Sequence, residues 1–287
     1  MKFGISLFFT AGSIRPRVLA PELERRGFES VWSGEHSHIP VTLTSAPPSS
    51  GVKPWYYEVM DPFVSLTAAA LATTTLKIGT GVCLIAQRDP IQTAKLVASI
   101  DQISDGRFLF GVGNGWNRAE IENHGSVFAT RHKRARESIE AMKAIWTSER
   151  AEYHGEIVTF DPIMTWPKPV QRPFPPILVG GAFPYSARRA ISYGTGWLPS
   201  IPNGKSDVLE DIPRFRQMAA EAGRDPASLP ITAWYPPRDL ELLSKYRDLG
   251  VERVVFSVPS ETAEAVWPHL DEIGELMMRV AGEGNRI

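Results

Sequence analysis

The sequence of 287 residues has very little cysteine, almost no net charge and no long apolar run. Its single cysteine, Cys83, excludes an internal disulfide and any metal centre built from several cysteines. A formal net charge of -1 gives no reason to expect nucleic acid or an anionic membrane as a partner. No stretch of about 20 apolar residues is present, so the sequence predicts no membrane-spanning helix.

Motifs of two large classes of nucleotide-binding enzymes are also missing. The first apolar run, GISLFF, is not followed by the G-x-G-x-x-G pattern of dinucleotide-binding sheets, and no loop ends in the Gly-Lys-Ser/Thr of a P-loop. The opening segment, MKFGISLFFTAG, is too short in apolar residues for a secretory signal and predicts a first strand. We therefore expect a cytoplasmic enzyme, and 43% apolar residues are enough for a sizeable core.

Short apolar runs alternate with longer amphipathic segments along the whole chain, which is the pattern of βαβ units. The apolar runs predict strands at 2–8, 30–33, 76–84, 107–113, 175–181, 196–200, 229–235 and 253–258. Helices are expected at 17–26, 61–73, 89–104, 131–147, 184–193, 206–222, 238–248 and 260–281. Eight strands in one alternation predict an α/β protein with a single domain, a (β/α)8 TIM barrel over residues 1–287. An open, doubly wound sheet is the main alternative.

Two segments interrupt this rhythm. Residues 37–60 are rich in proline and irregular, and loops of that length are often lids over a binding site. Residues 150–172 form an insertion, in which AEYHGEIVTF predicts a hairpin or a crossing strand and WPKPVQRP predicts an extended segment. We expect both to be additions to the barrel.

In a barrel of this kind the active site lies at the carboxyl ends of the strands. Glu35 and His36 follow the second predicted strand directly. A histidine at this place can donate to a cofactor carbonyl or transfer a proton near neutral pH, so both residues are catalytic candidates. The alternative is a structural polar pair in a turn.

Glycine-rich segments follow three other strands. Gly113-Asn114-Gly115 and Gly180-Gly181-Ala182 can expose successive backbone N–H groups, which is how concave amide sites and helix starts bind phosphate. Tight turns without a ligand are the alternative. The segment 79–82, which ends in Gly81-Val82, is either a bulge in a strand or a place where a planar ring can approach the backbone.

Aromatic residues are concentrated at the same predicted end of the barrel and suggest an apolar pocket for a ring system. We assign Phe9, Trp55, Tyr57, Trp116 and Trp234 to a substrate pocket. Phe8, Tyr56, Trp197 and Tyr235 belong to the same group of aromatics. Among the six histidines, His36 and His38 alone have a spacing typical of metal ligands, and Glu35 is the one carboxylate near them. We therefore expect no metal. Together with the glycine loops, the pocket predicts a phosphorylated, planar cofactor.

The residues also resemble a family. The run LKIGTGVCLIAQRDPIQTAKLVASIDQISDGRFLFGVGNGWNRAE is similar to the central block of luciferase-like flavin-dependent oxidoreductases of the bacterial luciferase superfamily. YHGEIVTFDP, PKPVQRPFPPILVGGA and GTGWLPS match in the same order, over at least residues 2–200. WPKPVQRP together with GVGNGWNRAE looks most like the branch that depends on the deazaflavin coenzyme F420.

The resemblance implies a role for each candidate. It places Glu35, His36, Gly81 and Val82 beside the cofactor ring, with a non-prolyl cis peptide at Gly81-Val82, and it places the phosphate at the two glycine loops. The sugar-phosphate dehydrogenases of the family carry a catalytic Glu where Trp116 stands, so a more apolar substrate is expected and His36 becomes the expected proton carrier.

The resemblance implies hydride transfer between F420 and a small organic substrate, in a homodimer. One alternative is an FMN-dependent monooxygenase that needs a flavin reductase as a partner. The other is a cofactor-binding barrel without catalysis.

Overall fold

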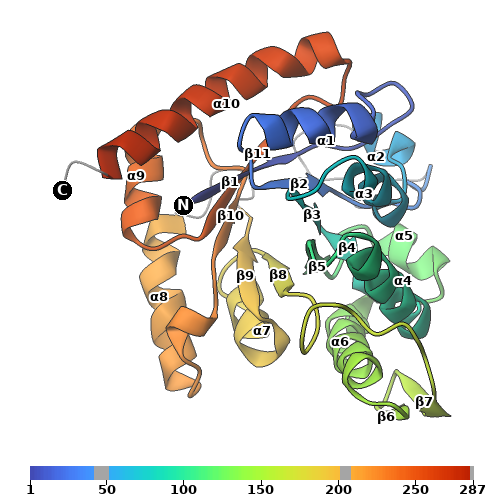
Figure 1. Ribbon diagram of the computed structural model, residues 1–287. Helices are drawn as coiled ribbons and strands as arrows, with labels where there is room; N and C mark the ends of the chain where they lie inside the picture. The colour runs from blue at the N-terminus through green and yellow to red at the C-terminus, as the bar shows by residue number, and fades with distance from the viewer. Residues whose placement is uncertain (42–51, 201–207, 285–287) are drawn as a thin grey trace.

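The computed structural model describes residues 1–41, 52–200 and 208–284. Strands and helices alternate along most of the chain (Figure 1). The strands are β1 Lys2–Ser6, β2 Ser30–Ser33, β3 Lys77–Thr80, β4 Cys83–Leu84, β5 Phe108–Gly113, β6 Ala151–His154, β7 Thr159–Ile163, β8 Ile177–Gly181, β9 Gly196–Pro199, β10 Thr232–Trp234 and β11 Arg253–Ser257. The helices are α1 Pro16–Arg25, α2 Trp55–Glu58, α3 Pro62–Leu71, α4 Pro90–Ile103, α5 Arg118–Asn123, α6 Arg131–Thr147, α7 Tyr185–Tyr193, α8 Val208–Glu221, α9 Leu240–Asp248 and α10 Ala263–Gly284.

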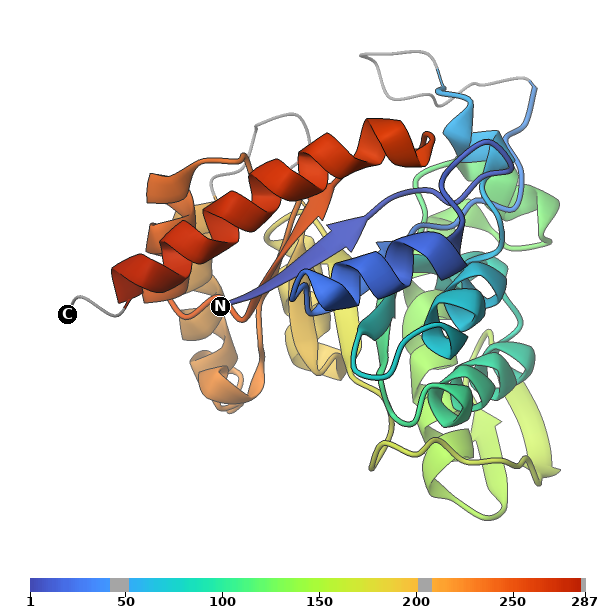
Figure 2. The same cartoon turned by 45° about the horizontal axis from the view of Figure 1, so that its top comes forward.

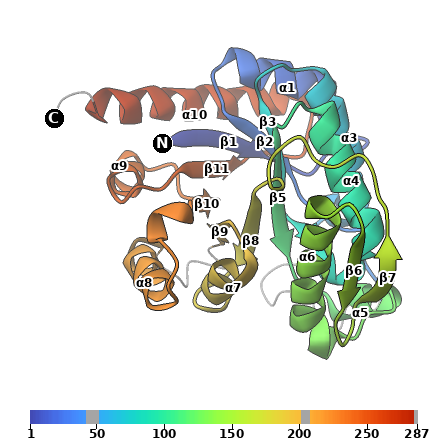
Figure 3. The ribbon, with the colours of Figure 1, turned by 60° about the horizontal axis from the view of Figure 1, so that its bottom comes forward.

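The parallel strands form a barrel. They pair in the order β10, β11, β1, β2, β3, β5, β8, β9, and β4 continues the path of β3 by pairing with β5. Two further bridges, Trp197 to Ile231 and Ser200 to Trp234, join β9 to the segment of β10 and bring the ends of the sheet together. Helices surround the strands in a ring (Figure 3). The predicted (β/α)8 barrel is therefore confirmed, and the open doubly wound sheet is excluded.

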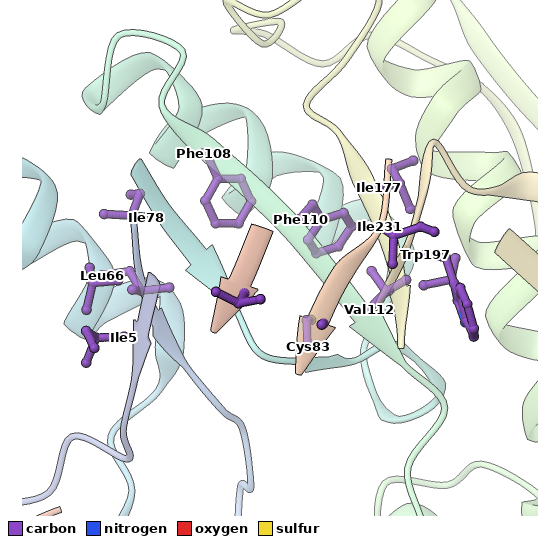
Figure 4. Close-up of a cluster of buried hydrophobic side chains, with 14 of the residues drawn as sticks. Ile5, Leu66, Ile78, Cys83, Phe108, Phe110, Val112, Ile177, Trp197 and Ile231 are labelled. Carbon is purple, nitrogen blue, oxygen red and sulfur yellow. The ribbon is translucent and has the colours of Figure 1, made fainter. Parts of the chain in front are cut away.

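Alternate side chains of the strands fill two apolar regions. Residues such as Ile78, Phe108 and Phe110 are fully buried in the larger region, which the close-up in Figure 4 shows. A smaller cluster draws its members from six different strands of the barrel: Trp32, Leu109, Leu178, Leu198, Trp234 and Val255. Because successive strand residues point to opposite faces, this smaller cluster fills the inside of the barrel, as expected for a barrel with a packed interior.

Two Asp-Pro pairs begin helices, as the sequence indicates. The Asp61 side chain accepts hydrogen bonds from the backbone N–H groups of Phe63 and Val64, at 2.8 and 3.3 Å. Asp89 accepts one from the N–H of Gln92 at 2.8 Å. These carboxylates satisfy amide groups that the first turn of a helix leaves unpaired. They fix where α3 and α4 start, at the end of the barrel where the candidate residues lie.

The structure corrects some expected elements. Residues 76–84 are not one strand, because the chain leaves β3 at a cis peptide between Gly81 and Val82 before β4 begins. The helices α2 and α5 were not expected. Part of the expected loop 37–60, residues 42–51, lies outside the described residues, as do residues 206–207 of the helix expected at 206–222. The insertion contains an antiparallel pair, β6 with β7, as the sequence indicates.

Candidate functional site

The candidate residues lie at the carboxyl ends of the barrel strands. Figure 2 shows β1 pointing toward the side where α2 and α5 lie. Because all strands of the barrel are parallel, the segments that follow β2, β4, β5 and β8 open on this same side. The residues named from the sequence are thereby brought to one end of the molecule, in two groups.

Glu35 is a buried, fully paired carboxylate. Its Oε1 accepts from Arg88 Nε at 2.6 Å, and its Oε2 accepts from the backbone N–H of Leu84 at 2.7 Å. Arg88 also reaches Asp61 at 2.6 Å and lies over the ring of Phe63. Glu35 thus ties the end of β2 to β4 and α3. With both oxygens engaged, it suits positioning better than proton transfer.

His36 is buried beside a second carboxylate that the sequence analysis did not find. Its Nδ1 lies 2.8 Å from Oε2 of Glu120, and the His36 and Glu120 side chains are 6% and 1% exposed. The His36 ring makes edge contacts with Tyr56 and Trp116, with centroids 5.0 and 5.8 Å apart. One face of the site is therefore a carboxylate–imidazole pair and the other is aromatic.

A cavity of about 470 Å³ adjoins this pair. It is lined by Glu35, His36, Ser37, Val59, Asp61, Gln87, Arg88 and His124. The Oε1 atom of Gln87 is buried with no hydrogen-bond partner among the described residues. Because an unpaired buried acceptor is costly, this oxygen is a suitable acceptor for a bound ligand.

The aromatic residues predicted for the pocket separate into different environments. Phe9 has no exposed surface and lies in the larger core cluster, so its assignment to the pocket is wrong. Trp234 lies inside the barrel and is close to Gly81: a Cβ added at Gly81 would lie 2.2 Å from the Trp234 ring. Trp116 contacts His36, as described. Trp55 and Tyr57 are 37% and 56% exposed.

The residue between them, Tyr56, is the one on α2 that faces the site. Its ring contacts Phe8, His36 and Trp116. Tyr56 was in the aromatic group read from the sequence but not in the predicted pocket. Residues 55–58 form the short helix α2, and consecutive side chains of a helix point in different directions. A helical turn predicted here would have indicated that only one of the three aromatic residues faces the site.

The glycine loops and Gly81-Val82 meet around one side chain. The Cγ atoms of Val82 lie 2.5 Å from where a Cβ of Gly113 would be and 3.0 Å from that of Gly180. Gly181 has φ +126°, a conformation that side chains rarely adopt, and Ala182 follows it before α7. The cis peptide that the resemblance implies is present at Gly81-Val82. The two loops therefore lie side by side, on β5 and β8, with Val82 between them.

Positive charge surrounds these loops. Asn114 lies 2.5 Å from Nδ1 of His132 at the start of α6. The Nε atoms of Arg131 and Arg189 are buried and have no hydrogen-bond partner among the described residues. Burial, and then the charges of Arg189 and Arg118, lower the pKa of Arg131 below its usual value. Two partly buried guanidinium groups near each other, with unpaired N–H groups, favour an anion between them.

The positive charges of Arg131 and Arg189 also act on His132. Desolvation, together with the positive charges of Arg131 and Arg189, lowers the pKa of the His132 imidazole to about 4. His132 is therefore neutral at pH 7 and adds no charge to the cluster unless an anion raises its pKa. Neither Arg131 nor Arg189 could be singled out from the sequence, because basic residues on a helix are usually solvated surface residues.

A basic groove continues outward from this cluster between α6 and α7. Its volume is about 550 Å³, and it is lined by His132, Lys133, Arg136, Tyr185, Arg188, Arg189, Ser192 and Tyr193. Lys133 pairs with Glu156, and Arg136 approaches Glu140 at 3.7 Å. Arg188 is exposed and has no ion pair within the described part of the chain. The groove therefore offers several cations to an anionic ligand.

The described residues contain neither a cluster of metal ligands nor a membrane-spanning helix. No group of three or more His, Cys, Asp or Glu side chains at 1–41, 52–200 and 208–284 could hold a metal ion. In the same ranges, no helix is both long and apolar enough to cross a membrane.

Comparison with known proteins gives a consistent result. Residues 1–236 match the family described as luciferase-like monooxygenase. An uncharacterised protein of Mycobacterium tuberculosis is 37% identical over 283 residues, covering 95% of this chain and 97% of its own. The F420-dependent hydroxymycolic acid dehydrogenase of the same organism is 29% identical, over 73% of this chain and 55% of its own. The FMNH2-dependent dimethylsulfone monooxygenase of Pseudomonas putida is 30% identical, over 62% and 49%.

Solved structures share the fold. The monooxygenase RslO1 from Streptomyces bottropensis superposes with a TM-score of 0.78 at 22% identity, covering 97% of this chain and 99% of its own. An F420-dependent secondary alcohol dehydrogenase, solved with an F420–acetone adduct, gives 0.75 at 19% identity, covering 97% and 98%. At these identities the likeness concerns the barrel alone.

Proposed function

Because the chain belongs to the luciferase-like monooxygenase family, we propose that it transfers a hydride between the deazaflavin coenzyme F420 and a fairly apolar organic substrate. The family has both F420-dependent and FMN-dependent members. Two groups of residues support the proposal: the cationic cluster beside the glycine loops, and the His36–Glu120 pair beside the aromatic wall. The homodimer and the cytoplasmic location expected from the sequence stay predictions.

The residues present fit the phosphate of such a cofactor. The unpaired Nε atoms of Arg131 and Arg189 are the observation that carries this step. Backbone N–H groups of the loops 113–115 and 180–182 add neutral donors, which is the usual construction of a phosphate site. A negatively charged phosphate group would relieve the repulsion between the two guanidinium groups and would raise the lowered pKa of His132.

The basic groove between α6 and α7 favours F420 over FMN. FMN ends at its phosphate, whereas F420 continues beyond its phosphate into a chain of carboxylates. Arg136 and Arg188 line the groove outside the phosphate cluster and offer charge that FMN would leave unused. Charge-assisted hydrogen bonds from guanidinium to carboxylate are strong and directional.

The chain's own residues would do three things in the reaction. Val82, packed between Gly113 and Gly180, would support one face of a ring system. Tyr56 and Trp116 would exclude water from the reacting centre and select apolar substrates. His36 would move the proton that accompanies the hydride. When bound, the deazaflavin supplies the hydride chemistry and does not activate oxygen.

Titration distinguishes the cofactors. The protein should bind oxidised or reduced F420, followed by absorbance or fluorescence, more tightly than FMN. Arg189→Ala should weaken both ligands, because both carry the phosphate. Arg188→Ala should weaken F420 more than FMN, since only F420 extends into the groove. Tight FMN binding without detectable F420 binding would overturn the assignment.

An FMN-dependent monooxygenase is the second candidate, favoured by the 30% identity to the FMNH2-dependent relative. It would need a flavin reductase as a partner and would consume oxygen. Oxygen uptake measured with supplied reduced FMN tests it. If neither cofactor gives turnover with a broad panel of substrates, the cofactor-binding barrel without catalysis remains.

A further inference from the structure

Glu120 is among the most buried carboxylates of the described chain. Its side chain is 1% exposed, and it lies on α5, at the third position of a short helix that Asn117 caps. Its two oxygens have different partners. Oε2 lies 2.8 Å from His36 Nδ1, while Oε1 accepts from the Ser37 N–H at 3.1 Å and from Gln87 Nε2 at 3.2 Å.

These partners determine which nitrogen of His36 carries the proton. Oε1 already accepts from two donors, and an ionised carboxylate has no proton to give, so Oε2 must accept from His36 as well. His36 Nδ1 therefore carries a hydrogen, and in the neutral ring Nε2 is left with its lone pair. Nε2 has no hydrogen-bond partner among the residues that the structure describes, and the ring that bears it packs against Tyr56 and Trp116.

We propose that Glu120 is a positioning residue that holds His36 as the Nδ1–H tautomer, so that Nε2 is the atom that exchanges a proton with the substrate. This step rests on the proposed hydride transfer. In the oxidative direction the substrate loses a hydride to the oxidised deazaflavin and a proton to Nε2. The imidazolium that forms is stabilised by the Glu120 carboxylate, and in the reductive direction both groups return to the substrate.

The same arrangement is known to matter elsewhere: in a serine protease triad, replacing the orienting carboxylate by an amide leaves the histidine in the wrong tautomer. Here the structure predicts how Glu120→Gln would be oriented. The amide oxygen must take the place of Oε1, because Ser37 and Gln87 both donate there. The amide NH2 then faces His36 Nδ1 and donates to it, which forces the hydrogen onto Nε2.

The test is nitrogen NMR of the protein labelled with 15N-histidine, without cofactor, at a pH at which imidazole is neutral. His36→Gln identifies the His36 signals by their loss. We expect a protonated Nδ1 and a bare Nε2 in the wild type, and the reverse in Glu120→Gln. Glu122→Gln is the matched control on the same helix, because Glu122 is 46% exposed and pairs only loosely with Arg118 at 3.5 Å.

A wild-type His36 with its hydrogen on Nε2 would overturn the proposal, and it does so even if Glu120→Gln fails to fold. An unchanged tautomer in a folded Glu120→Gln would overturn it too. In turnover with F420, the same variant should lower kcat by about 10²–10⁴-fold, the range for losing general acid–base catalysis, with little change in KM. Glu122→Gln should change neither.

The two readouts separate this proposal from the proposed function. If F420 neither binds nor turns over but the tautomer reverses in Glu120→Gln, the cofactor assignment fails while the role of Glu120 in orienting His36 stands. If F420 turns over normally in Glu120→Gln, the positioning role fails and the cofactor assignment stands.

Discussion

The side chain of Val82 occupies the space that a side chain at Gly113 would need. Its Cγ2 lies 2.5 Å from the ideal position of a Gly113 Cβ, closer than packed carbon atoms approach. Gly113 is therefore required by packing, whether or not its backbone also binds phosphate. The same holds less strictly for Gly180, where Val82 Cγ1 lies at 3.0 Å.

Gly113→Ala should therefore destabilise the protein. Pushing Val82 aside is an overpacking change, which costs about 1–3 kcal/mol, and it should also weaken cofactor binding because Val82 would move. Thermal or denaturant unfolding measures the first effect. Gly274→Ala is the control: outside the backbone of its own helix and its chain neighbours, nothing lies within 4 Å of its Cβ position, so the change should be neutral or stabilise α10 by about 0.5–1 kcal/mol. A Gly113→Ala protein as stable as the wild type would contradict the close approach.

Arg189→Ala should raise the pKa of His132. Desolvation and two like charges lower that pKa to about 4, so removing one charge lets the protonated imidazole form at higher pH. Adding inorganic phosphate to the wild type should raise the pKa as well, because an anion favours the protonated form. NMR titration of the His132 ring signals measures both. Arg150→Ala, an exposed residue in the turn before β6, should leave the pKa where it is.

If phosphate leaves the His132 signals unchanged, the cationic cluster does not bind the anion that we propose. If Arg189→Ala leaves the pKa unchanged in the absence of phosphate, the two side chains are not coupled as the structure has them.

Glu29 and Arg253 should make the barrel sensitive to acid. Arg253 donates to both oxygens of Glu29 at 2.6 Å, and its side chain is 3% exposed. Burial alone would raise the pKa of Glu29, but Arg253 outweighs it and the pKa falls to about 2. A carboxyl with a lowered pKa gives stability that is present above its unfolded pKa of 4.5 and is lost as the pH falls toward 2.

Glu29→Gln should therefore unfold more easily than the wild type at pH 7, by up to about 3 kcal/mol on the conversion of 1.36 kcal/mol per pKa unit. The difference should shrink as the pH falls from about 4.5 to 2. Denaturant melts across that range measure it. Glu241→Gln serves as the control, since this side chain is 79% exposed and its pair with Lys245 is a surface contact. If the wild type and Glu29→Gln differed in stability by the same amount at pH 2 and at pH 7, ionisation of Glu29 would not contribute to stability.

The barrel could be predicted from the sequence because its signals are local. Apolar runs recur along the chain and two α-helices begin at Asp-Pro pairs, and both signals depend on residues only a few positions apart. The His36–Glu120 pair could not be predicted in this way. It joins residues 84 positions apart, and α5, which carries Glu120, has six residues and too short an apolar pattern to be seen. The charges of Arg131 and Arg189 were missed for a related reason, since a polar helix face looks like a solvated one until the loops beside it are placed.

The sequence and the structure differ most clearly over Tyr56 and Tyr57. The sequence analysis chose Tyr57 for the pocket, and the structure turns Tyr56 toward His36 and Trp116 while Tyr57 is 56% exposed. Tyr56→Ala should lower kcat/KM for the substrate by about 2–10-fold, from the 0.5–1.5 kcal/mol that an aromatic pair contributes beyond its buried area. Tyr57→Ala should stay close to the wild type. Steady-state kinetics of both variants, with unfolding curves to verify the fold, decides between the two residues: a larger loss in Tyr57→Ala would restore the choice made from the sequence and would mean that α2 turns when substrate binds.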